Sequence, residues 1–224
     1  MSTIAEKLQL IAENQQNVYD AGYAAGVQLD SDSLFQYVTG AAYMFQNAIF
    51  PDGYTLVVNI PNIKADFGQF ISYAKGIKKL ILKGNTANNG LNCGYAFRGD
   101  YIEEVDFSEF GNGGLKATYL HGAFSAKKLH TISGELDLSV AVNIGGAFDN
   151  ATALQNICFK PLTIAKSIDF RYSNLLTAAS VQSIIDGLAD LTGSTTQTLT
   201  FHRDIALTDD QKSAITAKNW TLVQ

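Results

Sequence analysis

Apolar residues recur along this chain at a nearly constant interval, and phenylalanine marks the repeat most clearly. The intervals between the markers are 25, 27, 27 and 24 residues, and the markers are Phe45, Phe70, Phe97, Phe124 and Phe148. Three markers end near-identical frames, Tyr95-Ala96-Phe97, Gly122-Ala123-Phe124 and Gly146-Ala147-Phe148. A period in the twenties indicates a solenoid, in which each unit is too small to bury its own apolar face and stacks on its neighbours.

Each unit also predicts a short β-strand. A further apolar residue follows each marker after five to seven residues, at Phe50, Ile77, Ile102, Leu129 and Leu154. Alternating apolar pairs come next, at Leu80/Leu82, Val105/Phe107, Leu136/Leu138 (after Ile132) and Ile157/Phe159. Alternation places both apolar side chains on the core side of a strand and turns the residue between them outward. We therefore expect an α/β fold in which the repeats, over residues 41–174, stack into a narrow parallel sheet.

Residues 175–224 predict two helices that close the array. An apolar stripe at helical spacing is formed by Val181, Ile184, Ile185, Leu188 and Leu191, so the first helix should lie across the end of the stack. The second helix is predicted to begin at the capping-box sequence Thr208-Asp209-Asp210-Gln211 and to stop at Asn219. A terminal repeat differs from internal repeats because its outer face meets water, so we interpret this segment as a helical C-terminal capping repeat.

The first 26 residues carry a heptad pattern. Its inward positions are Ile4, Leu8, Ile11, Gln15 and Val18. Leucine at a with isoleucine at d favours trimers or tetramers over dimers, and Gln15 at an a position would fix the register. We therefore predict an N-terminal coiled-coil helix over 1–26 that forms a homotrimer, followed by a linker over 27–40. The alternative is an amphipathic helix folded back on the first repeat as a cap, because an isolated helix of this length is marginal in water.

From about residue 40 onward, the chain resembles the BspA-type leucine-rich repeats of bacterial surface proteins and phage structural proteins. The Ala-Phe frames, the following leucine and the short strand carry this resemblance. The stretch from Leu176 to Leu191, with Thr198-Leu199-Thr200-Phe201 and Lys218-Asn219-Trp220-Thr221-Leu222, is similar to the closing unit of such arrays in phage and prophage proteins of Gram-positive gut bacteria. The resemblance implies a leucine-rich-repeat solenoid and a place on a virion, but no chemistry.

Composition narrows the function classes. The chain has 46% hydrophobic and 17% charged residues, which suits a folded unit with a continuous core. A net charge of −5 without a lysine-rich stripe argues against nucleic acid, since phosphate recognition needs concentrated lysine and arginine. No window approaches a membrane span or a secretory signal, so we expect no membrane insertion. Cys93 and Cys158 are expected to be buried and reduced, with a bridge only if stacking brings them together.

The candidate catalytic groups match no familiar pattern. His121, His130 and His202 belong to no zinc motif and no serine elbow, and we interpret them as surface or turn residues. Four acidic residues cluster on and beside one predicted strand, at Glu103, Glu104, Asp106 and Glu109. They could supply paired carboxylates or calcium ligands, but outward positions on a solenoid strand are usually solvated. We therefore expect no catalytic site, no metal and no cofactor.

The remaining candidate chemistry is a binding surface. Four tyrosines near predicted turns could stack on sugar rings or anchor a protein contact, namely Tyr95, Tyr101, Tyr119 and Tyr172. The side chains predicted to point outward from the strands are Ile81, Asp106, Cys158, Asp169, Thr200 and His202, with Arg171 just beyond. This outward row mixes charges and contains few aromatic residues, so it indicates no particular ligand. Tyrosine is equally suited to a half-buried place at the edge of a solenoid, and that alternative stays open.

Together these features favour a non-enzymatic phage virion protein, a trimeric fibre or decoration appendage. Its N-terminal helix would assemble three copies and attach them to other virion proteins, while the repeats bind a host-surface protein or glycan with avidity. The alternative is a bacterial surface adhesin or a secreted interaction module with the same repeats, located outside the cell. An enzyme acting on carbohydrate would need convergent carboxylates with separated pKa values, which the sequence does not offer.

Overall fold

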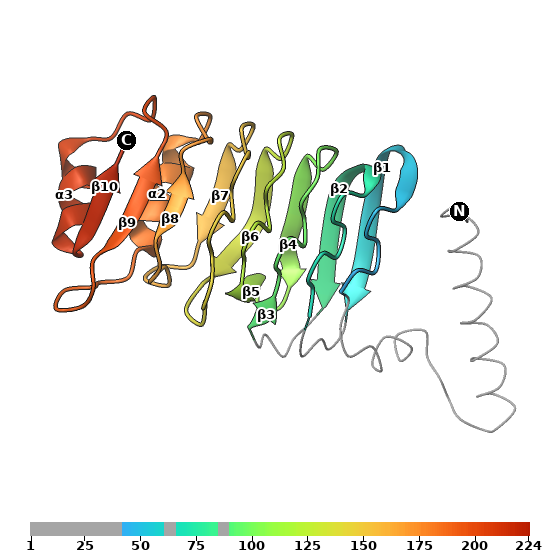
Figure 1. The fold of residues 1–224 in the computed structure, drawn as a ribbon, viewed down its shortest axis with the longest axis horizontal. Helices are drawn as coiled ribbons and strands as arrows, with labels where there is room; N and C mark the ends of the chain where they lie inside the picture. The colour runs from blue at the N-terminus through green and yellow to red at the C-terminus, as the bar shows by residue number, and fades with distance from the viewer. Residues whose placement is uncertain (1–41, 61–65, 85–89) are drawn as a thin grey trace, which may run out of the picture.

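The computed structural model describes residues 42–60, 66–84 and 90–224. These residues form an α/β structure in which parallel strands make a curled sheet and helices are few (Figure 1). The predicted helix at 1–26 and the predicted linker at 27–40 lie outside the described residues, and with them the proposed oligomerisation residues Ile4, Leu8, Ile11, Gln15 and Val18. In the described part of the chain, no helix is long and apolar enough to cross a membrane.

The strands follow one another in a row, and the helices lie near the C-terminal end of that row (Figure 1). In chain order the described elements are β1 (Ile49–Ile60), β2 (Lys75–Gly84), β3 (Leu91–Asn92), β4 (Glu104–Phe110), β5 (Gly114–Tyr119), β6 (Thr131–Asp137), β7 (Asn156–Phe159), β8 (Ile168–Phe170), α2 (Ala178–Gly187), β9 (Gln197–Phe201), α3 (Asp209–Ala217) and β10 (Trp220–Val223). The larger sheet has the order β1-β2-β4-β6-β5-β3, with β7 joined to β6, and the smaller sheet has the order β10-β9-β8.

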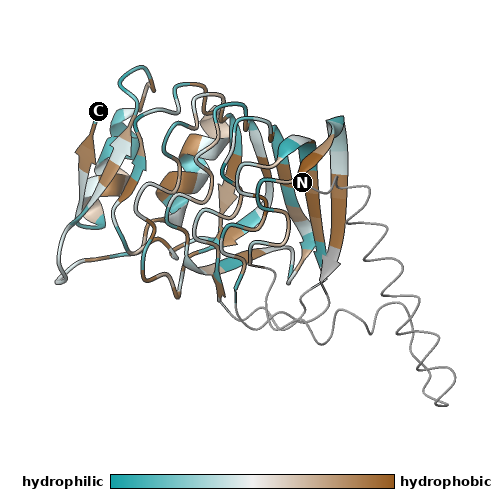
Figure 2. Ribbon diagram, turned by 45° about the vertical axis from the view of Figure 1, so that its right-hand side comes forward, coloured by the Kyte–Doolittle hydropathy of each residue, from teal (hydrophilic) through white to brown (hydrophobic). Residues whose placement is uncertain are grey.

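The strand register aligns the apolar pairs that the sequence predicted. Leu80 lies opposite Val105, and Val105 lies opposite Ile132, in parallel pairs. Every residue of the predicted pairs is at most 4% exposed. Hydrophobic and hydrophilic segments alternate along several strands in Figure 2. The prediction of parallel strands is therefore confirmed, and burial alternates at each predicted pair except Leu136/Leu138, where the intervening Asp137 is itself only 6% exposed.

The sheet curls because β6 has two different neighbours along its length. Its first half pairs with β4, and its second half pairs with β5, where Leu115 lies opposite Leu136. Gly134 separates the two halves with a φ of +89°, a backbone conformation that favours glycine. A Cβ atom at Gly134 would lie 2.9 Å from the carbonyl carbon of Phe107, so the close approach of the neighbouring unit also requires glycine.

Tight turns at 42–47, 68–73, 94–97, 121–124 and 145–150 hold successive units in register through the backbone. The Tyr95 N–H donates to the carbonyl of His121 at 2.8 Å, and the Phe97 N–H donates to the carbonyl of Ala123 at 3.0 Å. The aligned residues Tyr43, Gln69, Tyr95, Gly122 and Gly146 all have left-handed backbone, with φ between 54° and 62°. Stacking therefore aligns the side chains of each turn with those of the next, including side chains that face solvent.

These hydrogen bonds shift one marker of the predicted repeat. The Phe45 N–H donates to the carbonyl of Phe70, and the Ile71 N–H donates to the carbonyl of Ala96. Ile71 is therefore the equivalent of Phe97, and Phe70 is the equivalent of Ala96. The sequence-based marker at Phe70 is wrong by one residue. Phe70 is nevertheless fully buried, because its ring packs on Phe45 at 5.5 Å, so burial alone could not reveal the shift.

A row of stacked phenylalanine rings runs through the core. Ring centroids lie 5.2 Å apart from Phe97 to Phe124, 5.6 Å from Phe124 to Phe148 and 4.7 Å from Phe148 to Phe170. The row continues to Phe201 at 6.1 Å, which belongs to the smaller sheet. Such pairs contribute about 0.5 to 1.5 kcal/mol each beyond their burial. One continuous core therefore joins the two sheets.

Both predicted C-terminal helices are present, and the second begins where the sequence predicted. Thr177 caps α2, and Thr208 caps α3 with the complete capping box to Gln211. The predicted stripe is buried from Val181 to Leu188, but α2 ends at Gly187, so Leu191 lies beyond the helix and is only partly buried.

One predicted outward side chain is not exposed. Thr200 alternates with buried Leu199 and Phe201 in β9, yet it is only 8% exposed itself. β9 is the central strand of the smaller sheet, with β8 and β10 on either side. A short side chain on a central strand is covered by longer neighbours, so the expectation of an exposed Thr200 was wrong.

Candidate binding surface

The side chains predicted as a binding surface do not form one site. The structure places Tyr95 in the turn at 94–97, Tyr101 before β4, Asp106 within β4, Tyr119 at the end of β5, and Asp169, Arg171 and Tyr172 in and after β8. Tyr95, Tyr101 and Arg171 each line a different surface hollow. Residues that line these different hollows cannot contact the same small ligand.

Tyr95 lines a hollow that is explained by a change in side-chain size between neighbouring turns. The register of the turns makes Gly122 the equivalent of Tyr95, and Ser125 the equivalent of Arg98. A turn with two bulky side chains therefore lies directly beside a turn with two small ones. In the unit after that, Asp149 is the equivalent of Ser125 and restores a larger side chain. The Tyr95 ring covers Gly122, and the small Ser125 between the larger Arg98 and Asp149 leaves a depression across three units.

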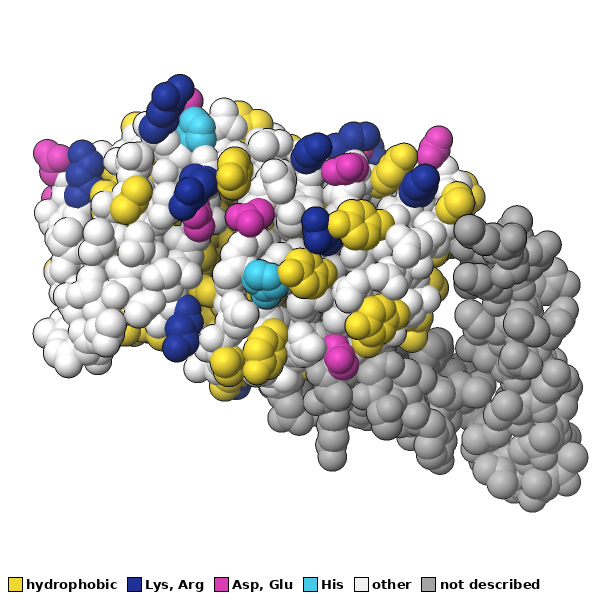
Figure 3. Space-filling view, viewed as in Figure 1, with side chains coloured by type: hydrophobic (Ala, Val, Ile, Leu, Met, Phe, Trp, Pro, Cys, Tyr) yellow, Lys and Arg dark blue, Asp and Glu magenta, His cyan; other side chains and the backbone are white. Residues whose placement is uncertain are grey.

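We call this depression the Arg98 groove, and it is lined by Tyr73, Tyr95, Arg98, His121, Gly122, Ser125, Asp149 and Asn150. It consists of two adjoining hollows of about 220 and 250 Å³, which share Arg98, Ser125 and Asn150. Figure 3 shows hydrophobic side chains, a histidine and charged side chains gathered across the middle of one face. The lining residues of the groove are therefore mixed in chemistry.

Aromatic rings hold the guanidinium of Arg98 in the groove. Its central carbon lies 5.0 Å from the ring centroid of Tyr73 and 5.5 Å from that of Tyr95. The Tyr95 ring in turn meets the His121 ring edge-on at 4.9 Å. Cation–π contacts of this kind contribute about 0.5 to 1 kcal/mol at exposed sites. Within the described residues, Arg98 has no carboxylate within 4.0 Å and no side-chain hydrogen bond, so its donors face solvent.

The far side of the groove carries a carboxylate, an amide and a hydroxyl group instead of a cation. Asp149 and Asn150 line it together with the hydroxyl of Ser125. In the described part of the chain, the Asp149 carboxylate likewise has no lysine or arginine within 4.0 Å. Lys127 and Asp100 line the hollow on the Tyr73 side. The groove thus offers a flat ring, an oriented cation and hydroxyl, amide and carboxylate groups within one small area.

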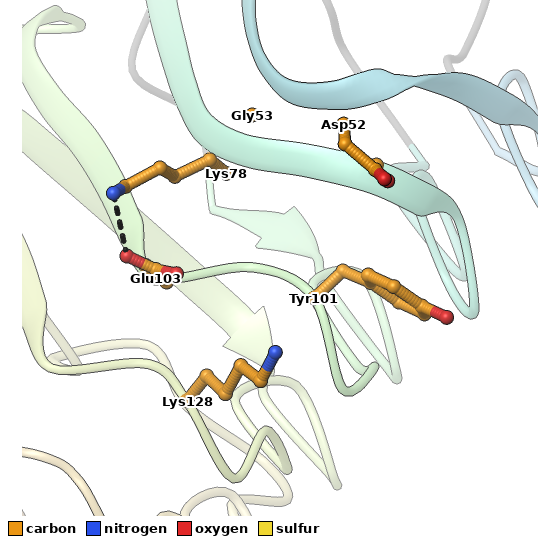
Figure 4. Close-up of a pocket in the computed structure, with 7 residues that line it drawn as sticks. Asp52, Gly53, Lys78, Tyr101, Glu103 and Lys128 are labelled. Carbon is orange, nitrogen blue, oxygen red and sulfur yellow. Dashed lines mark ion pairs between the residues drawn. The ribbon is translucent and has the colours of Figure 1, made fainter.

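Tyr101 belongs to a second hollow of about 240 Å³, near the start of the strands (Figure 4). The Lys128 ammonium lies 5.7 Å from the centroid of the Tyr101 ring. Lys78 and Glu103 line the same hollow and form an ion pair at 3.1 Å. Lys78 is thus already paired, whereas Lys128 and Asp52, which line the same hollow, form no ion pair within the described residues.

Three of the four carboxylates clustered around β4 pair with lysines of the neighbouring strand, and Asp106 instead accepts hydrogen bonds from Ser108. Besides the Lys78–Glu103 pair, Lys79 meets Glu104 at 2.9 Å and Lys83 meets Glu109 at 2.8 Å. The hydrogen bond from Lys79 holds the pKa of Glu104 below its ordinary value. These three carboxylates are therefore members of cross-strand ion pairs on a solvated face. Among the residues with described positions, no group of three His, Cys, Asp or Glu side chains is arranged to hold a metal ion.

The residues near the C-terminus form a third arrangement. Asp169 accepts a hydrogen bond from the Nε of Arg171 at 2.7 Å, so this arginine is already paired. Arg171 lines an open hollow of about 310 Å³ with His202 and Arg203. Tyr172 is 45% exposed, and no aromatic or cation contact of its ring is found among the described residues. Tyr119, 41% exposed, ends β5 on the other ladder of the curled sheet.

The two cysteines differ in their surroundings, and neither forms a disulfide. Cys93 is buried, and burial raises the pKa of its thiol. Cys158 is exposed on β7, so the expectation that both cysteines are buried was wrong for Cys158. Its outward position between buried Ile157 and Phe159 follows the predicted alternation.

The central residue of the groove, Arg98, was not among the predicted site residues, and neither was Tyr73. A sequence signal existed for Arg98, because it directly follows the Ala96-Phe97 frame. The position after the frame is Ser125 in the next unit and Asp149 in the one after, so the repeat itself marks a variable, outward position. Tyr73 gave no such signal, since its unit carries the marker shifted by one residue.

Comparisons with known proteins leave the family open. A scan against protein-family models found no match, and searches of curated proteins and of solved structures found none either. Any functional conclusion therefore rests on the residues and geometry described above.

Proposed function

We propose that this chain is a non-enzymatic recognition protein of a phage virion, built as a BspA-type leucine-rich-repeat solenoid that presents the Arg98 groove to a host or mucosal surface. The observation that carries this proposal is the groove itself. A guanidinium that lies over two tyrosine rings and has no ion-pair partner among the described residues, on a face made of stacked turns, is the arrangement of a recognition surface.

The stacked turns support the solenoid part of this proposal. Each turn donates backbone hydrogen bonds to the next, and the phenylalanine row crosses every boundary between units from Phe97 to Phe170. A single unit of this size would leave those groups unpaired and those rings exposed. Units that are stable only through their neighbours are typical of repeat proteins.

The C-terminal segment supports the role of a capping repeat. Serine hydroxyls of α2 bind the backbone of β7, where Ser180 accepts from the Ile157 N–H at 3.0 Å and Ser183 accepts from the Phe159 N–H at 2.9 Å. A helix thus takes the place of the next strand. A sheet edge that is covered in this way cannot recruit further strands.

The trimeric N-terminal helix remains part of the proposal on the strength of its heptad pattern. Three chains would present three Arg98 grooves in one assembly. Linked sites bind with an avidity of about 10²-fold or more over a single contact when the geometry allows simultaneous engagement. A small groove on each chain would gain from such an arrangement.

Immunogold electron microscopy tests the virion assignment. Antibody raised against the full chain would be applied to phage particles and to cells in an induced lysate of the source bacterium. We expect label on phage heads or tails. Label confined to cell envelopes would overturn the virion assignment and favour the alternative, a bacterial surface adhesin with the same repeats.

A further inference from the structure

We propose that the Arg98 groove binds a carboxylated sugar, that is, a uronic or sialic acid residue of an acidic glycan. The inference rests on the proposed function, because it names the ligand class of the same recognition surface.

The positive charge of Arg98 in the groove favours a negatively charged ligand. The Arg98 guanidinium lies over the rings of Tyr73 and Tyr95, and no described residue satisfies its donors. A planar guanidinium with free N–H groups matches a carboxylate through two parallel hydrogen bonds. Lys127 lines the adjoining hollow and has no ion pair within the described ranges, so it adds a second positive charge.

The rest of the groove matches the body of a sugar. Ser125 forms a floor without a bulky side chain, beside the partly exposed ring of Tyr95, which covers the buried Gly122. An aromatic ring next to an open floor accepts the apolar face of a pyranose. Ser125, Asn150 and Asp149 then supply the hydrogen-bond acceptors and donors that sugar hydroxyls require. Each hollow, at about 220 to 250 Å³, is small, which favours single sugar residues over a bulky ligand.

The carboxylate of Asp149 separates this ligand class from an acidic peptide. A peptide rich in Asp and Glu would bring further negative charge toward Asp149 and Asp100, which line the two hollows. An acidic sugar avoids this repulsion, because it offers one carboxylate to Arg98 and hydroxyl donors to Asp149. A neutral sugar would leave the guanidinium unused. Since the whole chain carries a net charge of −5, general attraction of polyanions is also disfavoured.

Isothermal titration calorimetry of the full chain with matched sugars tests the inference. The probes are galacturonic acid and its methyl ester, and 3′-sialyllactose and lactose. We expect at least one acid to bind about tenfold or more tightly than its neutral counterpart, since bidentate charge-assisted hydrogen bonds are lost with the charge. The two acids distinguish a uronic from a sialic source. Equal binding of acid and neutral forms, or no binding of either acid, would overturn the proposal.

Two arginine variants localise the effect. Arg98→Gln is expected to weaken binding of the acid about tenfold or more, while Arg203→Gln, which removes the same charge from a side chain that is 83% exposed, should bind as the wild type does. Unchanged thermal unfolding of both variants checks that they are folded. Wild-type affinity in Arg98→Gln would refute the assignment to this groove, as would tighter binding of poly-glutamate than of either sugar acid.

The failure of this inference can be told apart from failure of the proposed function. Ser125→Trp fills the groove without changing its charge, whatever the chemistry of the ligand. If this variant abolishes retention of the chain on host cells while no sugar acid binds, the carboxylated-sugar inference is overturned and the recognition role stands.

Discussion

At the scale of single residues, the groove exists because side-chain size changes abruptly between aligned positions. Tyr95 and Gly122 share a left-handed backbone, with φ of 56° and 58°. This conformation favours glycine, and a bulky residue there costs about 1 to 2 kcal/mol. Packing against the next unit offsets part of that cost at Tyr95, because the Tyr95 ring lies over Gly122 and beside the His121 ring. The glycine is thus part of the site.

The fit between Tyr95 and Gly122 gives a first prediction. A Cβ atom at Gly122 would lie 2.6 Å from two carbons of the Tyr95 ring. We expect Gly122→Ala to lower the free energy of unfolding by about 1 to 3 kcal/mol through overpacking, measured by urea denaturation. Gly113→Ala is the matched control, since Gly113 also has positive φ but meets nothing within 4 Å. Equal losses in the two variants would contradict the proposed contact.

Asp137 provides a prediction about pH. Burial raises the pKa of this carboxyl, but hydrogen bonds from Ser139 and Lys160 outweigh burial and leave the pKa below its ordinary value. A lowered folded pKa means that Asp137 stabilises the fold above its unfolded pKa of about 3.9, and that this stability is lost as pH falls through the folded value.

We therefore expect Asp137→Asn to lower the free energy of unfolding by about 1 to 2 kcal/mol at pH 7, with the difference shrinking below about pH 4. Denaturation curves collected from pH 7 down to pH 3 would measure it. Lys160→Gln removes only one partner and should cost less. A pH-independent difference would show that the charge of Asp137 has no role.

Sequence reasoning located part of the groove. It selected Tyr95 because tyrosine near a turn is a common binding residue, but it gave the same weight to Tyr119 and Tyr172, which lie elsewhere. Side chains meet across units only when the backbone register is known. That register depends on hydrogen bonds such as Tyr73 to Arg98, at 2.8 Å, which no local pattern specifies.

At the scale of elements, the end of the larger sheet is formed by a helix. The two serines of α2 that face β7 satisfy backbone groups that a further strand would otherwise bind. Ser180 also donates to the carbonyl of Gln155 at 2.8 Å, so one hydroxyl serves both a donor and an acceptor of the edge. The apolar stripe of α2 packs against the core beside these contacts.

Ser180→Ala should therefore destabilise the fold. It leaves the Ile157 N–H without its partner at a site where Ser180 is 3% exposed, and it removes one of two hydrogen bonds to the Gln155 carbonyl, which also accepts from the Thr177 N–H at 3.0 Å. We expect a loss of about 1 to 3 kcal/mol, measured by chemical denaturation. Ser183→Ala is the control, because Ser183 is partly exposed and water can replace its hydroxyl. A smaller loss for Ser180→Ala than for Ser183→Ala would contradict this account of the sheet edge.

Helices and strands were predicted correctly from the sequence where a local sequence pattern agreed with the role of the same residues in the core or at a helix end. The capping box at Thr208 and the apolar alternation at Val105 and Phe107 each combine local chemistry with a tertiary role, and both were confirmed. The second ladder of β3 and β5 was not predicted. Leu91 and Asn92 form a strand of two residues, too short to show a period of two in the sequence.

At the scale of the whole molecule, stacking gives an extended face on which each unit adds one row of side chains. The smaller sheet joins the same core through Phe170 and Phe201, so the C-terminal region is fixed to the array. A groove on such a rigid face needs little reorganisation on binding, which favours affinity. The assembly of several chains would multiply that affinity.

Removal of residues 1–26 tests the assembly. Light scattering after size exclusion should show the full chain at three times its mass of 24.2 kDa and the shortened chain at one mass. We expect the shortened chain to keep cooperative thermal unfolding. Aggregation or loss of folding would instead support the alternative that the first helix is a cap on the repeats.

The retention of fluorescent full-length protein on cells of the source bacterium and on mucin-coated surfaces tests the central claim most directly. The comparison is between the wild type, Ser125→Trp in the groove and Ser194→Trp at an exposed position outside it. The account predicts that Ser125→Trp lowers retention about tenfold or more, as expected when a binding hot spot is blocked, and that Ser194→Trp leaves it unchanged. Wild-type retention of Ser125→Trp would contradict a recognition role for the Arg98 groove.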